Sequence, residues 1–228
     1  MGDEEIGAGI KLRTVSVVDA AADALRQMIL DGVLEPGERL RETDFSRRLG
    51  IARHTFRAAT QILIGEGLLR RSPNRGVQLA VLEPEDISDI FRLRSALELE
   101  AVREVVRAGE PIPAAEEAVA RLNALPASAP WRSVVDADMD FHRAIIDAAA
   151  SERMTRAYAS VQSEILLCMA QLKPHYDHPD EVAQEHRDLL EPLVDGNPEL
   201  AEQRFRAHLD EATENLTQAL QAREEVTI

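Results

Sequence analysis

Residues 39–80 read RLRETDFSRRLGIARHTFRAATQILIGEGLLRRSPNRGVQLA. The pattern predicts a short helix from about Glu42 to Leu49 that stops at Gly50, because glycine commonly follows the last helical residue. A second helix is predicted from about Arg53 to Gly65, followed by a ribbon over 68–80 whose turn is 72–76. Two short helices joined by a tight turn that contains glycine are typical of a helix-turn-helix. The second helix of such a motif can enter the major groove of DNA.

Charge favours this interpretation of residues 39–80. The stretch holds nine arginines against three acidic residues, a net charge of +6. Arg53 and Arg57 are one turn apart and therefore share a helix face. An arginine can bond guanine O6 and N7 together, which is worth about 1–3 kcal/mol of discrimination. The alternative is that these arginines are ordinary solvated surface residues. The residues that we predict to contact DNA are Arg41, Thr43, Arg53, His54, Arg57, Arg75 and Gly76.

Several short motifs carry a resemblance to a known family. They are 34–40 (LEPGERL), 49–51 (LGI), Arg53 with Arg57, 66–69 (EGLL) and 74–76 (NRG). Through them, residues 16–80 resemble the winged helix-turn-helix domain of GntR-family transcription regulators. The resemblance implies that Arg53 and Arg57 read bases and that Gly76 lies on the wing.

Three positions depart from the family pattern. The family usually has Ser, Pro and Glu where this chain has Ala52, Thr55 and Ala58. Ala52 cannot cap the second helix through its side chain, which costs about 0.5–2 kcal/mol of helix stability. These departures predict an operator that differs from the usual one of the family.

The chain on either side of this stretch sets the domain limits. Residues 1–12 mix Gly, Asp and Glu without periodicity, which predicts a disordered tail. An apolar stripe from Val18 to Ile29 predicts a supporting helix that begins at Ser16 or Asp19 and ends at Gly32. Pro84 suits the first turn of a further helix. We therefore predict a DNA-binding domain over 13–82, a second domain over 83–228 and a hinge near Pro84.

Composition separates the two predicted domains further. The net charge of the 228 residues is −15, but residues 11–81 hold twelve Lys and Arg against eight Asp and Glu, or +4. Residues 82–228 hold fourteen against thirty, or −16. An acidic second part would repel DNA and so help to orient the basic part toward it. The single cysteine, Cys168, excludes an intrachain disulfide, and no apolar run is long enough to span a membrane. Both features agree with a cytoplasmic protein.

After Pro84 the periodicity predicts an all-α antiparallel bundle of six helices with short connections. The predicted helices are 85–108, 113–125, 130–149, 152–172, 179–195 and 198–222. The fold class is therefore mainly α, with a three-helix winged domain before the bundle. Cys168 lies in an apolar run and is interpreted as a core residue rather than as a redox switch. Trp131 is interpreted as a core or interface residue rather than as a ligand platform.

Four polar residues interrupt the apolar stripes of three of these helices. Asp138 and His142 are four residues apart and so lie on one face, while His186 and His208 fall within the stripes of two later helices. Burying an aspartate without a partner costs several kcal/mol. Taken singly, each histidine could be a satisfied core residue. Together, the four predict a site for a divalent zinc, nickel, manganese or iron ion.

Residues 85–222 also resemble the FCD ligand-binding domain of the FadR-like branch of the GntR family. The motifs are 93–98 (LRSALE), 138–142 (DMDFH), 185–186 (EH) and 207–209 (AHL). The resemblance implies that Asp138, His142, His186 and His208 hold the metal, and that the effector is an organic or sugar acid. Arg94 lies beside an apolar stripe, so we predict that it binds the effector through its carboxylate. Asn215 lies two turns past His208 on the same side of its helix, so we predict that it lines the effector pocket. An internal salt bridge from Arg94 to Glu98 or Glu164 is the alternative.

The sequence and the two resemblances thus predict a transcription regulator, expected to be a repressor. The resemblance, together with the paired half-sites that helix-turn-helix dimers read, implies a homodimer on a pseudo-palindromic operator. A small carboxylate bound at the metal site would control its affinity for DNA. Two alternatives stay open at this point: a metal-responsive regulator without an organic effector, and a metal-dependent enzyme.

Overall fold

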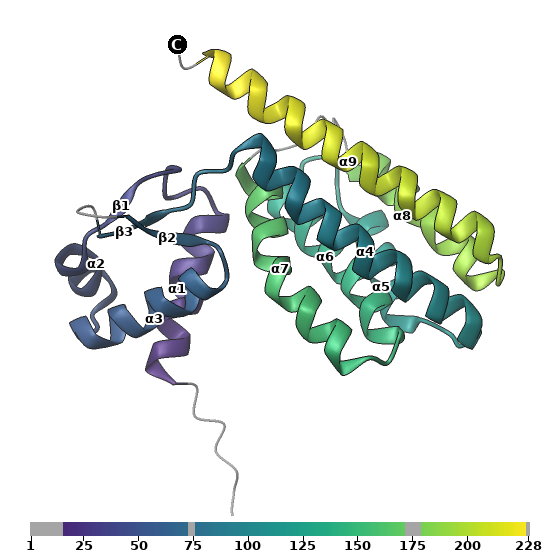
Figure 1. Ribbon diagram of the computed structural model, residues 1–228, viewed down its shortest axis with the longest axis horizontal. Helices are drawn as coiled ribbons and strands as arrows, with labels where there is room; N and C mark the ends of the chain where they lie inside the picture. Colours follow the sequence, from purple (N-terminus) through teal and green to yellow (C-terminus); the bar gives the residue numbers. More distant parts are fainter. Residues whose placement is uncertain (1–15, 73–75, 172–178, 227–228) are drawn as a thin grey trace, which may run out of the picture.

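The computed structural model describes residues 16–72, 76–171 and 179–226. Within them the chain forms nine helices and one small sheet (Figure 1). The predicted tail over 1–12, most of the wing turn with Arg75, and the histidines at 175 and 178 lie outside the described residues. No helix among the described residues is both long enough and apolar enough to cross a membrane.

The N-terminal part contains three helices and three short strands. The elements are α1 (Val17–Leu30), β1 (Arg39–Leu40), α2 (Glu42–Leu49), α3 (Arg53–Gly65), β2 (Leu69–Ser72) and β3 (Gly76–Leu79). The bounds of α2 and α3 agree with the prediction. Gly50 ends α2 at φ 65°, a left-handed conformation that glycine adopts without steric cost. Helix α1 packs against α3 behind the helix-turn-helix, as expected of a scaffold helix.

The caps of α1 and α3 differ. The Ser16 hydroxyl accepts a hydrogen bond from the Val18 backbone N–H at 3.2 Å, so that Ser16 rather than Asp19 begins α1. Ala52 stands at the N-cap of α3 in an extended conformation, and its side chain makes no cap hydrogen bond. Helix α3 is therefore held by the burial of Phe56 and Leu63 and not by its cap.

The wing is a three-stranded antiparallel sheet in the order β1-β3-β2. The two wing strands pair in the register Leu69↔Leu79 to Ser72↔Gly76, as expected for the ribbon. Strand β1 was not predicted, because two residues are too short to show an alternating pattern. Its pairing of Arg39 with Gln78 attaches the segment before α2 to the wing.

Six helices form the C-terminal part. They are α4 (Pro84–Ala108), α5 (Pro113–Ala124), α6 (Trp131–Ala148), α7 (Glu152–Gln171), α8 (Pro179–Val194) and α9 (Pro198–Val226). Four of them begin at a proline, whose missing N–H has no intrahelical partner in the first turn in any case. Helix α9 is four residues longer than predicted and lies along α4 (Figure 1). Helix α6 packs against α4, α5, α7 and α8, which places its apolar face inside the bundle.

The two parts contact each other directly. A single hydrophobic cluster runs from Leu25 and Ile29 of α1 to the bundle. Arg132 at the start of α6 pairs with Asp31 after α1 at 3.1 Å. Gly67, at φ 75°, lies so close to the Glu164 side chain of α7 that a Cβ atom there would overlap the carboxylate. The division at residue 82 and the hinge near Pro84 remain predictions.

Candidate metal centre and DNA-reading surface

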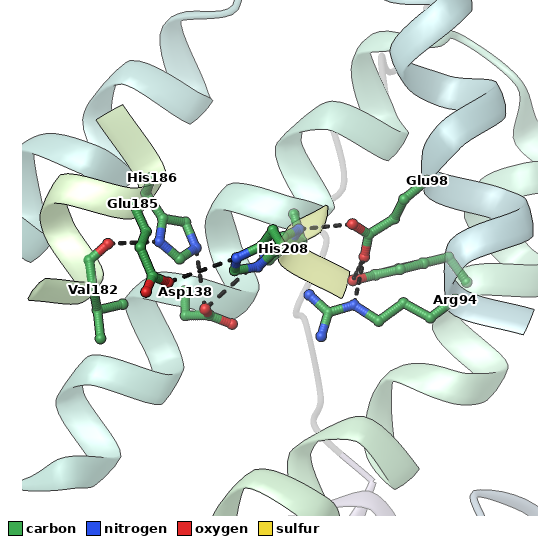
Figure 2. Close-up of polar contacts among 9 residues, drawn as sticks. Arg94, Glu98, Asp138, Val182, Glu185, His186 and His208 are labelled. Carbon is green, nitrogen blue, oxygen red and sulfur yellow. Dashed lines mark hydrogen bonds and ion pairs between the residues drawn. The ribbon is translucent and has the colours of Figure 1, made fainter. Parts of the chain in front are cut away.

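Three helices bring the four predicted metal ligands together. Asp138 and His142 come from successive turns of α6, His186 comes from α8, and His208 comes from α9. One ligand atom from each lies within 4.8 Å of all the others. Asp138, His142 and His186 are buried and His208 is nearly so. The sequence predicted inward faces for these residues, and the structure brings all four together. Figure 2 labels three of them, Asp138, His186 and His208.

The outer nitrogens of the three imidazoles already face other groups. Each Nδ1 lies near an oxygen outside the set: His142 near Glu98 Oε2 at 2.8 Å, His186 near Val182 O at 2.8 Å, and His208 near Glu185 Oε2 at 3.6 Å. An acceptor on one ring nitrogen fixes the orientation of the ring and leaves the other nitrogen to bind a metal. The three Nε2 atoms are therefore the ones available for an ion.

The inner atoms are poorly satisfied by one another. His186 Nε2 lies 3.1 Å from Asp138 Oδ1 but without hydrogen-bond geometry, and Asp138 Oδ2 is buried without a partner. His142 Nε2 and His208 Nε2 are 3.3 Å apart. Buried polar atoms without partners are rare because each costs about 1–3 kcal/mol. Imidazole nitrogens and a carboxylate oxygen are donors suited to a borderline divalent ion, so these residues fit a metal.

Electrostatics favour the metal-binding protonation state at Asp138 and His142. Burial lowers the pKa of His142 to about 4, despite the neighbouring Glu98, so this ring is neutral near neutral pH. Burial opposes ionisation of Asp138, but His186, His142 and Arg94 outweigh it and hold its pKa below the ordinary value. Burial likewise lowers the pKa of His186, but Asp138 overcomes this effect and raises it. A bound cation would displace that extra proton.

Glu98 is the residue that the sequence analysis missed as part of this site. Its carboxylate is fully buried and accepts hydrogen bonds from Arg94 Nε at 2.7 Å and from the Tyr158 hydroxyl at 3.0 Å. Its second oxygen faces His142 Nδ1. Burial alone would raise the pKa of Glu98, but Arg94 and His142 lower it to about 2. The signal in the sequence was its spacing of four residues from Arg94, which we interpreted only as a candidate salt bridge.

The structure shows the alternative interpretation of Arg94, and the predicted contact with an effector stays a prediction. Arg94 forms the internal salt bridge to Glu98, whereas Glu164 lies against Gly67. Its Nη2 is nevertheless buried without a hydrogen-bond partner. Arg94 also lines a small cavity together with Asp138, His208 and Asn215. Arg94 can therefore donate to an anion without leaving Glu98.

The cavity itself is small and mostly apolar. Its volume is about 20 Å³, and its remaining walls are Trp131, Val134, Met169, Val182, Ala212 and Leu216. A space of roughly 10–15 Å³ holds one water molecule. The cavity therefore suits an ion or a water molecule, and an organic acid would fit only after its walls had moved.

Six of the seven predicted DNA contacts fall within the described residues, all in the N-terminal part of the chain. Arg53, His54 and Arg57 are exposed on the first turns of α3. Four of the predicted residues line one open groove of about 740 Å³ between α2, α3 and the wing: Arg41, Thr43, Arg57 and Gly76. Arg39 and Arg71, which the sequence analysis counted only as part of the positive charge, line the same groove. The groove is therefore open and rich in arginine, as a surface that meets phosphates requires.

Comparisons with known proteins assign both parts of the chain to known domains. The family model for the FCD domain matches residues 89–211, and the model for bacterial regulatory proteins of the gntR family matches residues 18–79. A "Probable D-xylose utilization operon transcriptional repressor" of Paenarthrobacter nicotinovorans is 29% identical over 203 residues, which are 87% of this chain and 88% of the relative. The HTH-type transcriptional regulator YdhC of Bacillus subtilis is 27% identical over 201 residues, 86% of this chain and 89% of the relative.

A solved structure extends the comparison to the whole fold. The crystal structure of a GntR transcriptional regulator from Rhodococcus sp. RHA1 superposes with a TM-score of 0.81 at 29% identity. The match covers 90% of this chain and 99% of that structure. The arrangement of winged helix-turn-helix and helical bundle is thus shared over nearly the full length.

Proposed function

This chain belongs to the GntR family, with an FCD domain after its helix-turn-helix, and we propose that it is a repressor whose operator affinity is set by a small carboxylate bound at a metal ion. The family and the relatives are transcription regulators and not enzymes, so the chain is a DNA-binding regulator. The proposal concerns the bound metal, the chemical class of the effector and the role as a repressor. DNA binding would place the protein in the cytoplasm of a bacterial cell.

One observation carries the proposal. Three imidazoles turn their Nδ1 atoms outward to acceptors and their Nε2 atoms inward toward the Asp138 carboxylate. Asp138, His142, His186 and His208 would hold the ion, which would supply open coordination positions for an acid. Arg94 Nη2, buried without a partner beside these ligands, would donate to the carboxylate of that acid. Asn215 would contact its remaining polar atoms.

Control of DNA binding then follows from linkage between two sites. We propose that a homodimer reads two half-sites of a pseudo-palindrome through Arg53, His54 and Arg57 on α3, with the start of α2 and the wing alongside. The effector would favour one arrangement of the two parts of the chain, with residues near Pro84 as the hinge. Such coupling is typically about 1–3 kcal/mol.

A metal-responsive regulator without an organic effector is the second candidate. The volume of the cavity favours it, because about 20 Å³ accommodates an ion but no acid. A thermal-shift screen of small carboxylates and sugar acids, with and without a chelator, separates the two. A ligand at 100 times its Kd stabilises the folded state by about 2.7 kcal/mol. A shift from an acid that requires the metal supports the first proposal, and shifts from metals alone support the second.

The ligand set is tested by replacing His186 with alanine. We expect His186→Ala to lose bound metal by elemental analysis and to lose the response to effector, while DNA binding is retained. His54→Ala is the matched control, because it removes a histidine from α3 and should keep the metal. A metal content equal in His186→Ala and in the unmodified protein would refute the assignment.

The DNA-reading surface is tested by replacing Arg53 with alanine. Because its side chain is exposed, Arg53→Ala should leave the thermal unfolding midpoint unchanged and abolish specific DNA binding in a filter-binding assay. Retained affinity for the operator would contradict the role given to α3.

A further inference from the structure

The two arginines predicted to read bases are held differently. Arg57 donates from Nε to Glu42 Oε2 at 2.6 Å and from Nη2 to Glu42 Oε1 at 3.1 Å. Arg53, one turn earlier on the same helix, has no ion-pair partner in the described part of the chain. One arginine of the pair is therefore tethered and the other is free.

The partner of Arg57 has to come from outside α3. The sequence of α3, RHTFRAATQILIG, contains no acidic residue, and Ala58 follows Arg57 directly. Glu42 is the first residue of α2, across the groove from α3. The helix-turn-helix angle thus brings the two side chains together across fifteen positions of sequence.

The geometry of the pair leaves the reading edge of Arg57 open. The carboxylate occupies the Nε side of the guanidinium, so the N–H groups of Nη1 and the second N–H of Nη2 point away from it. Two parallel N–H groups at that end match O6 and N7 of guanine. The Arg57 side chain is 72% exposed whereas that of Glu42 is 27% exposed, so the carboxylate is recessed and the guanidinium projects.

The tether reduces the conformational freedom of Arg57 before DNA arrives. A free arginine has many rotamers and loses them when it binds, which weakens each hydrogen bond that it forms. An exposed ion pair adds little to folding stability, so its main effect here is on orientation. We infer that Glu42 is a positioning residue that aims Arg57 at one guanine and sets the sequence preference at that base pair. The inference rests on the proposed DNA-reading role of α3.

A role through charge alone would leave a different signature. Glu42 brings a negative charge toward phosphates, so its neutralisation would strengthen binding to every duplex by a similar factor. Asp44 provides the matched control, because it is an acidic residue of the same first turn that has no bond to Arg57. Asp44→Asn and Glu42→Gln remove the same charge from the same end of α2, and only the second breaks the two-oxygen ion pair with Arg57.

The experiment is selection from a library of randomised DNA duplexes, with the full chain, Glu42→Gln, Asp44→Asn and Arg57→Ala compared. We expect the full chain and Asp44→Asn to select the same consensus. Glu42→Gln should lose preference at one base pair of each half-site, the pair at which Arg57→Ala also loses it. Fluorescence anisotropy should show that the ratio of specific to non-specific DNA affinity is about fivefold or more lower for Glu42→Gln than for the unmodified protein. A fifth protein that combines Glu42→Gln with Arg57→Ala should lose no more preference at that base pair than Arg57→Ala alone.

Other outcomes overturn the inference. An unchanged consensus for Glu42→Gln, with tighter binding to all duplexes as for Asp44→Asn, would show that Glu42 acts only through charge. A loss at a base pair that Arg57→Ala does not affect would mean that Glu42 does not act through Arg57. If the full chain selects no sequence, the proposed function itself fails and the inference fails with it. Equal thermal unfolding midpoints verify that all five proteins are folded.

Discussion

Glu98 links Arg94, Tyr158 and His142 in one buried network behind the proposed metal centre. Each of these groups would be costly to bury alone, and the single carboxylate contacts all three. It orients His142 and keeps Arg94 charged beside the cavity. Glu98 thus supports the proposed metal centre without being one of its predicted ligands.

Replacement of Glu98 by glutamine should destabilise the protein by about 3–5 kcal/mol near neutral pH, because the Arg94 charge stays buried without its counter-ion. The folded-state pKa of Glu98 is about 2, below its ordinary value of 4.5. The stabilisation is therefore fully present above pH 4.5 and is lost as the pH falls toward 2. Urea unfolding at a series of pH values measures this. A difference between the two proteins that stays constant below pH 4.5 would contradict the assigned pKa.

At the scale of single elements, proline and glycine made the helices predictable. Gly50 and the prolines that open α4, α5, α8 and α9 are local signals, so the helix bounds agree within a few residues. The inward positions of Asp138 and His142 followed from their spacing along one helix. The contact of Glu98 with His142 joins residues 44 positions apart on different helices, and the size of the cavity depends on packing. Neither leaves a local pattern in the sequence.

The missing cap of α3 gives a prediction at this scale. Ala52→Ser supplies a hydroxyl that can accept from the first backbone N–H groups of α3, so it should stabilise the protein by about 0.5–2 kcal/mol. Ser16→Ala, which removes the existing cap of α1, is the reciprocal variant and should destabilise it by a similar amount. Both are measured by urea unfolding. A destabilised Ala52→Ser protein would indicate that this hydroxyl prefers another partner.

At the scale of the whole molecule, the basic N-terminal part and the acidic helical bundle meet at a few defined contacts. Arg132 pairs with Asp31, Arg70 pairs with Asp86 at the start of α4, and Gly67 lies against Glu164. Burial raises the pKa of Glu164, as expected for a carboxyl held between two packed surfaces. The proposed transmission from effector to DNA would have to change this junction.

Gly67→Ala tests the close approach at the junction. The left-handed backbone at φ 75° costs an alanine about 1–2 kcal/mol, and its Cβ would also overlap the Glu164 carboxylate. We expect a loss of stability larger than the backbone cost alone. Adding Glu164→Ala should remove the steric contribution to the loss of unfolding free energy and leave the contribution of the strained backbone. Urea unfolding of the single and double variants measures both. Equal stability of the two Gly67→Ala proteins would show that Glu164 yields without cost.

Trp131 is the only tryptophan in the chain, and it stands where the two parts of the molecule meet. Its indole N–H donates to the Met169 carbonyl at 3.1 Å, and its side chain lines both the cavity beside the ligands and the groove between α1 and α6. Indole emission responds to the polarity around the ring. The protein therefore contains an intrinsic fluorophore at the point where a signal would pass, and its spectrum would follow occupancy of the centre in solution without any added dye.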